Sequence, residues 1–138
     1  MEMKLIQRDW EALAGKRMQF THGFYERLFE RHPQYRHLFP EAMDSQMEKM
    51  VEMFSSVTRF ADHTDLVRPY LTSVGYTHRR LGIHAQDVEN FKQAFVDTLA
   101  HLCAEWWDDT HARAWHAAFD DTIVPLFDEG LETGRENG

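Results

Sequence analysis

Apolar side chains recur at steps of three and four residues along almost the whole chain, which is the spacing of helices with one buried face. Alternating apolar and polar runs, and hairpin turn pairs followed by a second strand, are missing. The pattern predicts an all-α fold of about seven helical segments. The expected helices cover residues 5–13, 18–29, 41–60, 65–81, 85–106 and 108–132, with a short turn-like segment at 35–40.

Helix breakers set the expected ends of these helices. Pro33 stops the second helix, Gly82 offers a stop after the fourth, and Pro125 should kink or shorten the last. No interdomain linker, internal repeat or low-complexity tract interrupts the pattern. We therefore expect one domain over residues 1–132 and a flexible C-terminal tail over residues 133–138.

Composition narrows the class of protein. The chain has 138 residues, 13% of them aromatic, so it is long enough to bury a core. Its net charge of −8 disfavours a general nucleic-acid binder. No apolar run is long enough to span a membrane, and the N-terminus is too charged for a signal peptide, so we expect a cytoplasmic protein. The lone Cys103 lies in an apolar run, where a buried small hydrophobe is expected.

Three polar residues interrupt the apolar faces: Tyr25, Gln46 and His78. Burial of a polar group without a partner costs about 1–3 kcal/mol, so such positions are informative. Each alone has an ordinary explanation. A tyrosine hydroxyl can reach a backbone carbonyl, a glutamine can reach water from the edge of a face, and a histidine can be satisfied within a core.

Taken together, these residues match a known pattern. The segments FYERLFERHPQYRHLF (24–39), SQMEKM (45–50) and YTHRRLGI (76–83) occur in the order and at the spacing of a globin's second helix, distal helix and proximal segment. The chain resembles a globin, and among globins the bacterial single-domain group related to the haem domain of flavohaemoglobins. The resemblance covers residues 5–130, nearly the whole chain.

The resemblance implies a globin fold, a three-on-three helical sandwich around one haem b (iron protoporphyrin IX), with His78 as the iron ligand. A neutral imidazole suits this role. Apolar haem contacts are implied for Phe39, Met50, Val74 and Ile83. Haem-propionate contacts are implied for Lys49, Arg79, Arg80 and His84, whose alternative is a solvated charged face. Coordination of the iron by a deprotonated Lys49 is a further alternative.

The resemblance also implies a function. Tyr25 and Gln46 would form the distal network that donates hydrogen bonds to O₂, so that O₂ is released slowly. The expected function is reversible binding of O₂, and of NO and CO, with O₂-dependent NO detoxification as an enzymatic possibility that needs an external reductase. The alternative is a gas-responsive haem sensor acting on a separate partner protein. The sequence leaves monomer and homodimer both open.

The chain departs from the family pattern on the proximal side. In flavohaemoglobins and their single-domain relatives, a tyrosine and a glutamate hydrogen-bond the proximal histidine. This chain has Asp87 and Val88 where the tyrosine is expected, and only Glu129 and Glu132 as candidates for the glutamate. The resemblance therefore does not imply the electron-donating proximal network of that group.

Overall fold

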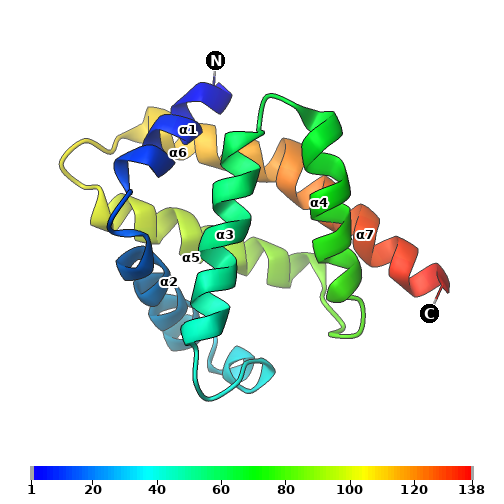
Figure 1. Cartoon of the computed structure of the whole chain (residues 1–138). Helices are drawn as coiled ribbons and strands as arrows, with labels where there is room; N and C mark the ends of the chain where they lie inside the picture. The colour runs from blue at the N-terminus through cyan, green and yellow to red at the C-terminus, as the bar shows by residue number, and fades with distance from the viewer. Residues whose placement is uncertain (1, 138) are drawn as a thin grey trace.

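The computed structural model describes the backbone of residues 2–137 and the side chains of residues 3–133. It is all-α, as predicted, and no strand occurs among the described residues. Figure 1 shows the helices crossing one another around a common interior. In chain order the elements are α1 (Glu2–Ala12), α2 (Arg17–Arg31), the 3₁₀ helix η1 (Pro33–Leu38), α3 (Asp44–Arg59), α4 (Thr64–Thr77), α5 (Ala85–Leu102), α6 (Asp109–Ala118), the π-helical segment η2 (Phe119–Ile123) and α7 (Val124–Asn137).

Three pairs of helices form most of the packing. α4 lies along α7, α1 along α6, and α2 against α5, while α3 packs on α1 and α2. Each pair joins segments far apart in the sequence, so the interior is built from long-range contacts. Within the described part of the chain, no helix is long and apolar enough to cross a membrane.

The core is aromatic. Phe95 of α5 lies at its centre, with its ring centroid 4.4 Å from that of Phe54 and 4.9 Å from that of Phe20. Trp115 of α6 packs on it at 5.5 Å. All four side chains are fully buried. Aromatic pairs in these tilted and edge-on arrangements stabilise a core beyond their buried area. The apolar stripes predicted from the sequence thus point inward and meet.

Several helix ends differ from the prediction, and α5 ends at Leu102 rather than at residue 106. α4 ends at Thr77, before the predicted end near Leu81, and Leu81 is 46% exposed. The chain leaves the helix at His78, and the left-handed turn at Gly82 (φ 66°) follows in the loop. α3 begins at Asp44, later than expected. The apolar spacing extends past the observed helix ends into loop residues that are not buried. A single residue at a helix end adds little to the periodic signal, so the spacing does not determine where the helix ends.

The last helix is interrupted as its proline predicts. η2 widens the helix over five residues, and Pro125 follows in the first turn of α7. Proline lacks the N–H that an α-helix needs at that point, so a wider turn before it relieves the clash with the preceding turn. α7 then continues to Asn137, through most of the segment predicted as a tail. Gly138 lies outside the described residues. The flexibility of this segment stays a prediction.

Candidate functional site

His78 lies at the C-terminal end of α4, half-buried, with one ring nitrogen engaged. Its Nδ1 lies 2.7 Å from the backbone oxygen of Val74. A carbonyl oxygen can only accept, so this contact assigns the proton to Nδ1. The hydroxyl of Thr77 lies 3.3 Å from the same nitrogen. Nε2 is therefore left with its lone pair, in the tautomer that a metal ion requires, and the ring is held by the backbone of its own helix.

The proximal surroundings of His78 differ from the family pattern, as the sequence indicates. The ring of Phe127 packs edge-on against the imidazole, with centroids 5.5 Å apart. Glu129 forms an ion pair with Arg68 at 2.6 Å, and Glu132 is exposed. Within the described part of the chain, His78 thus has a neutral carbonyl partner and an aromatic neighbour. A neutral acceptor makes an imidazole less electron-donating than a carboxylate does.

Tyr25 and Gln46 meet, as the resemblance implies. The side-chain amide of Gln46, near the start of α3, donates to the hydroxyl of Tyr25 on α2 at 3.3 Å. Tyr25 is only 5% exposed. Burial raises the pKa of its phenol, and the hydrogen bond from Gln46 lowers it in part. The phenol therefore stays protonated. Since its oxygen already accepts from Gln46, its own proton remains to be donated to a ligand.

Aromatic side chains pack on Tyr25, and the other apolar residues implied by the resemblance are buried or half-buried. Phe39 packs on Tyr25 with ring centroids 5.5 Å apart and on Phe29 at 5.4 Å. Met50 lies one turn after Gln46 on α3 and is buried. Val74 and Ile83, on either side of His78 in sequence, are half-buried. A dry, apolar setting strengthens a hydrogen bond from Tyr25 to a ligand.

The cationic residues predicted to contact propionates lie at or near the surface. Lys49 and Arg80 are exposed. Arg79 stacks over the ring of Tyr76 at 4.0 Å and donates to the Tyr76 backbone oxygen at 3.0 Å. His84 is exposed at the N-terminal end of α5, where its backbone N–H donates to Asp87 at 2.9 Å. Their role towards propionates stays a prediction.

A second polar link near the site was not predicted. The hydroxyl of Tyr35, on η1, donates to Asp87 of α5 at 2.6 Å and accepts from Asn90 at 3.0 Å. The hydrogen bond from Tyr35 lowers the pKa of Asp87, and the backbone N–H of His84 lowers it further. This link fastens η1 to the start of α5. The sequence pointed to this link only through Asp87, an acidic residue at the position where the family has a tyrosine.

The two parts of the expected haem site lie on different helices. α3 and α4 are not among the closely packed helix pairs of the described residues. The first turns of α3, with Gln46, and the last turn of α4, before His78, both lie in the lower half of Figure 1. One imidazole with a free lone pair and one buried donor pair in an apolar setting are the groups that an iron porphyrin and its gas ligand need. Within the described residues, no group of three or more His, Cys, Asp or Glu side chains could hold a metal ion.

Comparison with known proteins agrees with this geometry. The globin family matches residues 22–125 of the chain. A flavohemoprotein of Chromobacterium violaceum is 27% identical over 136 residues, which cover 94% of this chain and 32% of that protein. This chain thus spans about a third of the length of that relative.

Two further relatives match over nearly their full length. An anaerobic nitrite reductase of Oryza sativa subsp. indica is 26% identical over 132 residues, which cover 91% of each protein. A solved structure, a hexacoordinated heme protein from an anhydrobiotic tardigrade, is similar with a TM-score of 0.75 at 14% identity, over 97% of this chain and 93% of that one. At that identity the likeness to the solved structure shows the fold alone.

Proposed function

Because the chain belongs to the globin family, we propose that it holds haem b through Nε2 of His78 and binds O₂, NO and CO reversibly. The observation that carries this proposal is the buried Tyr25–Gln46 pair, whose phenol proton is free to be donated. A structural haem would not need a buried donor in an apolar setting. The contact between His78 Nδ1 and the Val74 oxygen supports the same proposal from the opposite side.

The other site residues would hold the cofactor. Phe39, Met50, Val74 and Ile83 would contact its apolar faces, and we assign the propionates to the four surface cations Lys49, Arg79, Arg80 and His84. Charged propionates at a solvent-exposed edge pair with such cations at little desolvation cost. Lys49 is exposed, which favours this role over direct coordination of the iron.

We propose O₂-dependent oxidation of NO to nitrate as the reaction of this site. A bound haem iron would supply the gas binding and one electron for each nitrate formed, and an external reductase would have to return that electron. Tyr25 and Gln46 hold O₂ by hydrogen bonds and delay its release. Phe127 beside His78 and the Glu129–Arg68 ion pair leave His78 with a neutral partner, which favours gas binding over peroxide cleavage and counts against a fast oxidation of NO.

The test is the O₂ dissociation rate of the haem-loaded protein. A hydrogen bond to a charged acceptor contributes about 1.5–3 kcal/mol, so Tyr25→Phe should speed O₂ release by about 10- to 100-fold. Tyr70→Phe is the matched control, because Tyr70 is an exposed tyrosine of α4. An unchanged rate in Tyr25→Phe, measured by stopped-flow mixing with CO, refutes the distal assignment.

Reduction of nitrite is a second candidate, since a relative named for it matches over 91% of both chains. The two reactions can be distinguished because oxidation of NO requires O₂ and reduction of nitrite does not. With an added reductase, oxygenated protein should consume NO and yield an equal amount of nitrate. Faster NO production from nitrite under argon than NO consumption under air would favour the second candidate.

A further inference from the structure

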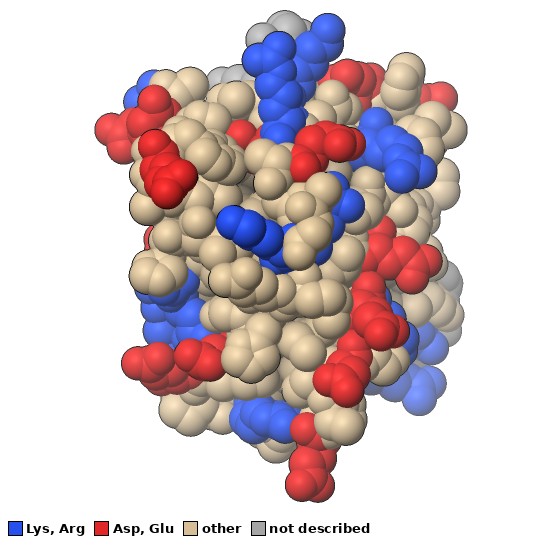
Figure 2. Space-filling model, turned by 60° about the vertical axis from the view of Figure 1, so that its left-hand side comes forward, with Lys and Arg blue, Asp and Glu red and all other residues tan. Residues whose placement is uncertain are grey.

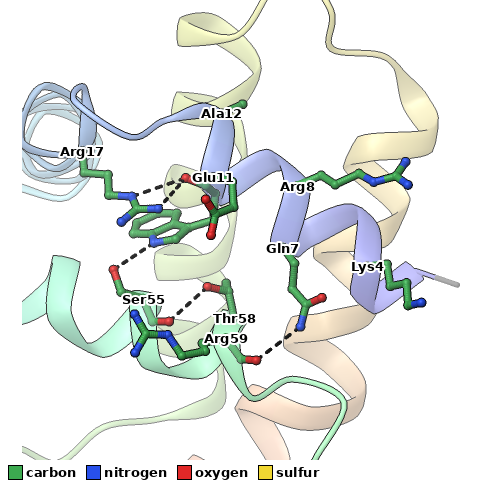
Figure 3. Close-up of a pocket in the computed structure, with 10 residues that line it drawn as sticks. Lys4, Gln7, Arg8, Glu11, Ala12, Arg17, Ser55, Thr58 and Arg59 are labelled. Carbon is green, nitrogen blue, oxygen red and sulfur yellow. Dashed lines mark hydrogen bonds between the residues drawn. The ribbon is translucent and has the colours of Figure 1, made fainter.

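An open hollow lies on the surface between α1 and the second half of α3. Its volume is about 730 Å³. Figure 3 shows its lining, which comes from α1, the start of α2 and the last turns of α3. Neither His78 nor the Tyr25–Gln46 pair belongs to this lining. The hollow is thus separate from the haem site proposed above.

The lining of the hollow is strongly basic. Four of its side chains are cationic, and Glu11 is the single carboxylate. The cations are Lys4, Arg8, Arg17 and Arg59. This concentration of positive charge contrasts with the net charge of −8 of the whole chain. Figure 2, in which the left-hand side of Figure 1 is turned forward, shows Lys and Arg side chains on this face with Asp and Glu side chains interspersed among them.

The four cations have no partners of opposite charge. None of them takes part in an ion pair among the described residues. Arg17 is held in place by hydrogen bonds to the Trp10 backbone oxygen, at 2.9 Å from Nη2 and 3.3 Å from Nε, and by stacking over the Trp10 ring at 5.1 Å. A fixed arginine with a remaining free N–H edge is preorganised to bind an anion.

Interactions with the C-terminal ends of helices explain only two of the four cations. Arg17 satisfies a carbonyl at the end of α1, and Arg59 lies in the last turn of α3, where cations oppose the helix dipole. Lys4 and Arg8 lie one turn apart in the first two turns of α1, away from its C-terminal end. Like charges that face one hollow repel one another unless an anion lies between them.

We propose that this hollow binds an anion carrying two or more phosphate groups. The cations come from three helices and line an opening larger than one phosphate, with Arg17 and Arg59 on one side of α1 in Figure 3 and Lys4 and Arg8 on the other, so a single small anion would leave some of them unpaired. Arginine binds phosphate oxygens through paired N–H groups, and lysine adds a point charge. The hydroxyl of Ser55 accepts from the Trp10 indole at 2.9 Å and keeps its own proton to donate. Glu11 opposes the anion and weakens its binding.

Isothermal titration of the full haem-loaded chain with sodium tripolyphosphate, in magnesium-free buffer of low ionic strength, tests this proposal. We expect saturable binding of one anion per chain that weakens as salt is added. Arg8→Gln and Arg59→Gln should each weaken it by about tenfold, since each removes a charge-assisted contact. Glu11→Gln should strengthen it several-fold. An unchanged haem spectrum in each variant shows that the fold is kept.

Arg113→Gln is the matched control, because Arg113 is exposed on α6 and outside the lining of the hollow. If this variant loses as much affinity as Arg8→Gln, binding follows overall charge and the proposed site is wrong. Absence of saturable binding also overturns the proposal. Vesicles of phosphatidylcholine with and without phosphatidylinositol 4,5-bisphosphate distinguish the sources. Co-sedimentation only with the phosphorylated lipid, lost in Arg59→Gln, identifies a lipid headgroup, and binding of the free polyphosphate alone identifies a soluble anion.

Discussion

Replacement of Gly75 by alanine tests how closely α4 must approach α7 to hold His78. A Cβ at Gly75 would overlap the carbonyl oxygen of Phe127 and lie 3.1 Å from the backbone nitrogen of Leu131. The contact is reciprocal, because a Cβ at Gly130 would overlap the carbonyl oxygen of Thr72. Both overlaps involve backbone atoms, which cannot rotate away as a side chain can. The two helices would have to move apart.

The expected magnitude follows from two opposing effects. Alanine in place of glycine favours a helix by about 1 kcal/mol. Overpacking of a closely packed contact costs about 1–3 kcal/mol, and a backbone neighbour places this site at the upper end. Gly75→Ala should therefore lower the free energy of unfolding by about 2 kcal/mol. Gly23→Ala is the matched control, since its Cβ would meet only Thr98 Cγ2, at 3.5 Å. It should leave stability unchanged or raise it by about 0.5–1 kcal/mol.

Urea denaturation followed by circular dichroism measures both variants. We expect a loss of stability in Gly75→Ala and no loss in Gly23→Ala, and equal losses in the two variants would refute the expected overlap. A second measurement links the crossing to the site. Gly75 lies one turn before His78, and Phe127 touches the imidazole ring, so Gly75→Ala should also change the rate of CO binding to the reduced haem protein. Gly23→Ala should not.

Three further predictions concern single polar groups. Asp9 accepts from the Trp115 indole and from His111 Nδ1, each at 2.9 Å, so Asp9→Ala leaves these donors unpaired and should lower the free energy of unfolding by about 1–3 kcal/mol in urea denaturation; a loss no larger than that of Asp62→Ala, at an exposed position, would contradict this. Burial raises the pKa of Cys103 to about 11, so this thiol should react with Ellman's reagent at about pH 8 far more slowly in the folded than in the unfolded protein; equal rates would be the contrary result. Burial raises the pKa of Tyr25 above its usual value of 10.0, and a raised acid keeps its proton below that pKa, so O₂ dissociation should be the same at about pH 7 and about pH 9; faster release at the higher pH would show that the donor had ionised.

Periodicity predicted the fold because each helix repeats its signal over several turns. Phe54 and Phe95 lie in the core, and Cys103 is buried as expected. The ends of helices carry no such repetition. Leu81 continued the spacing of α4 but lies in the loop after it, because the chain turns away at His78. Tertiary contacts near the end of a helix decide this boundary, and spacing does not record them.

The candidate site was predictable where a polar residue interrupts an apolar stripe. Tyr25 and Gln46 were found in this way, and the resemblance to globins that gave them a common role is confirmed at the level of the family. Phe127 beside His78 was not predicted, since an aromatic residue on an apolar face carries no distinguishing signal. The Asp9–His111 contact joins residues more than a hundred positions apart, and no local pattern links them.

The absorption spectrum of the purified chain with haem tests the central claim most directly, because it reports the ligand of the iron. In the reduced, gas-free protein we predict a five-coordinate spectrum that shifts on addition of CO. His78→Gly should lose this spectrum, and added imidazole should restore it by occupying the vacated position. A Soret band that is absent from the native chain, or that persists unchanged in His78→Gly, would contradict the assignment of His78 as the iron ligand.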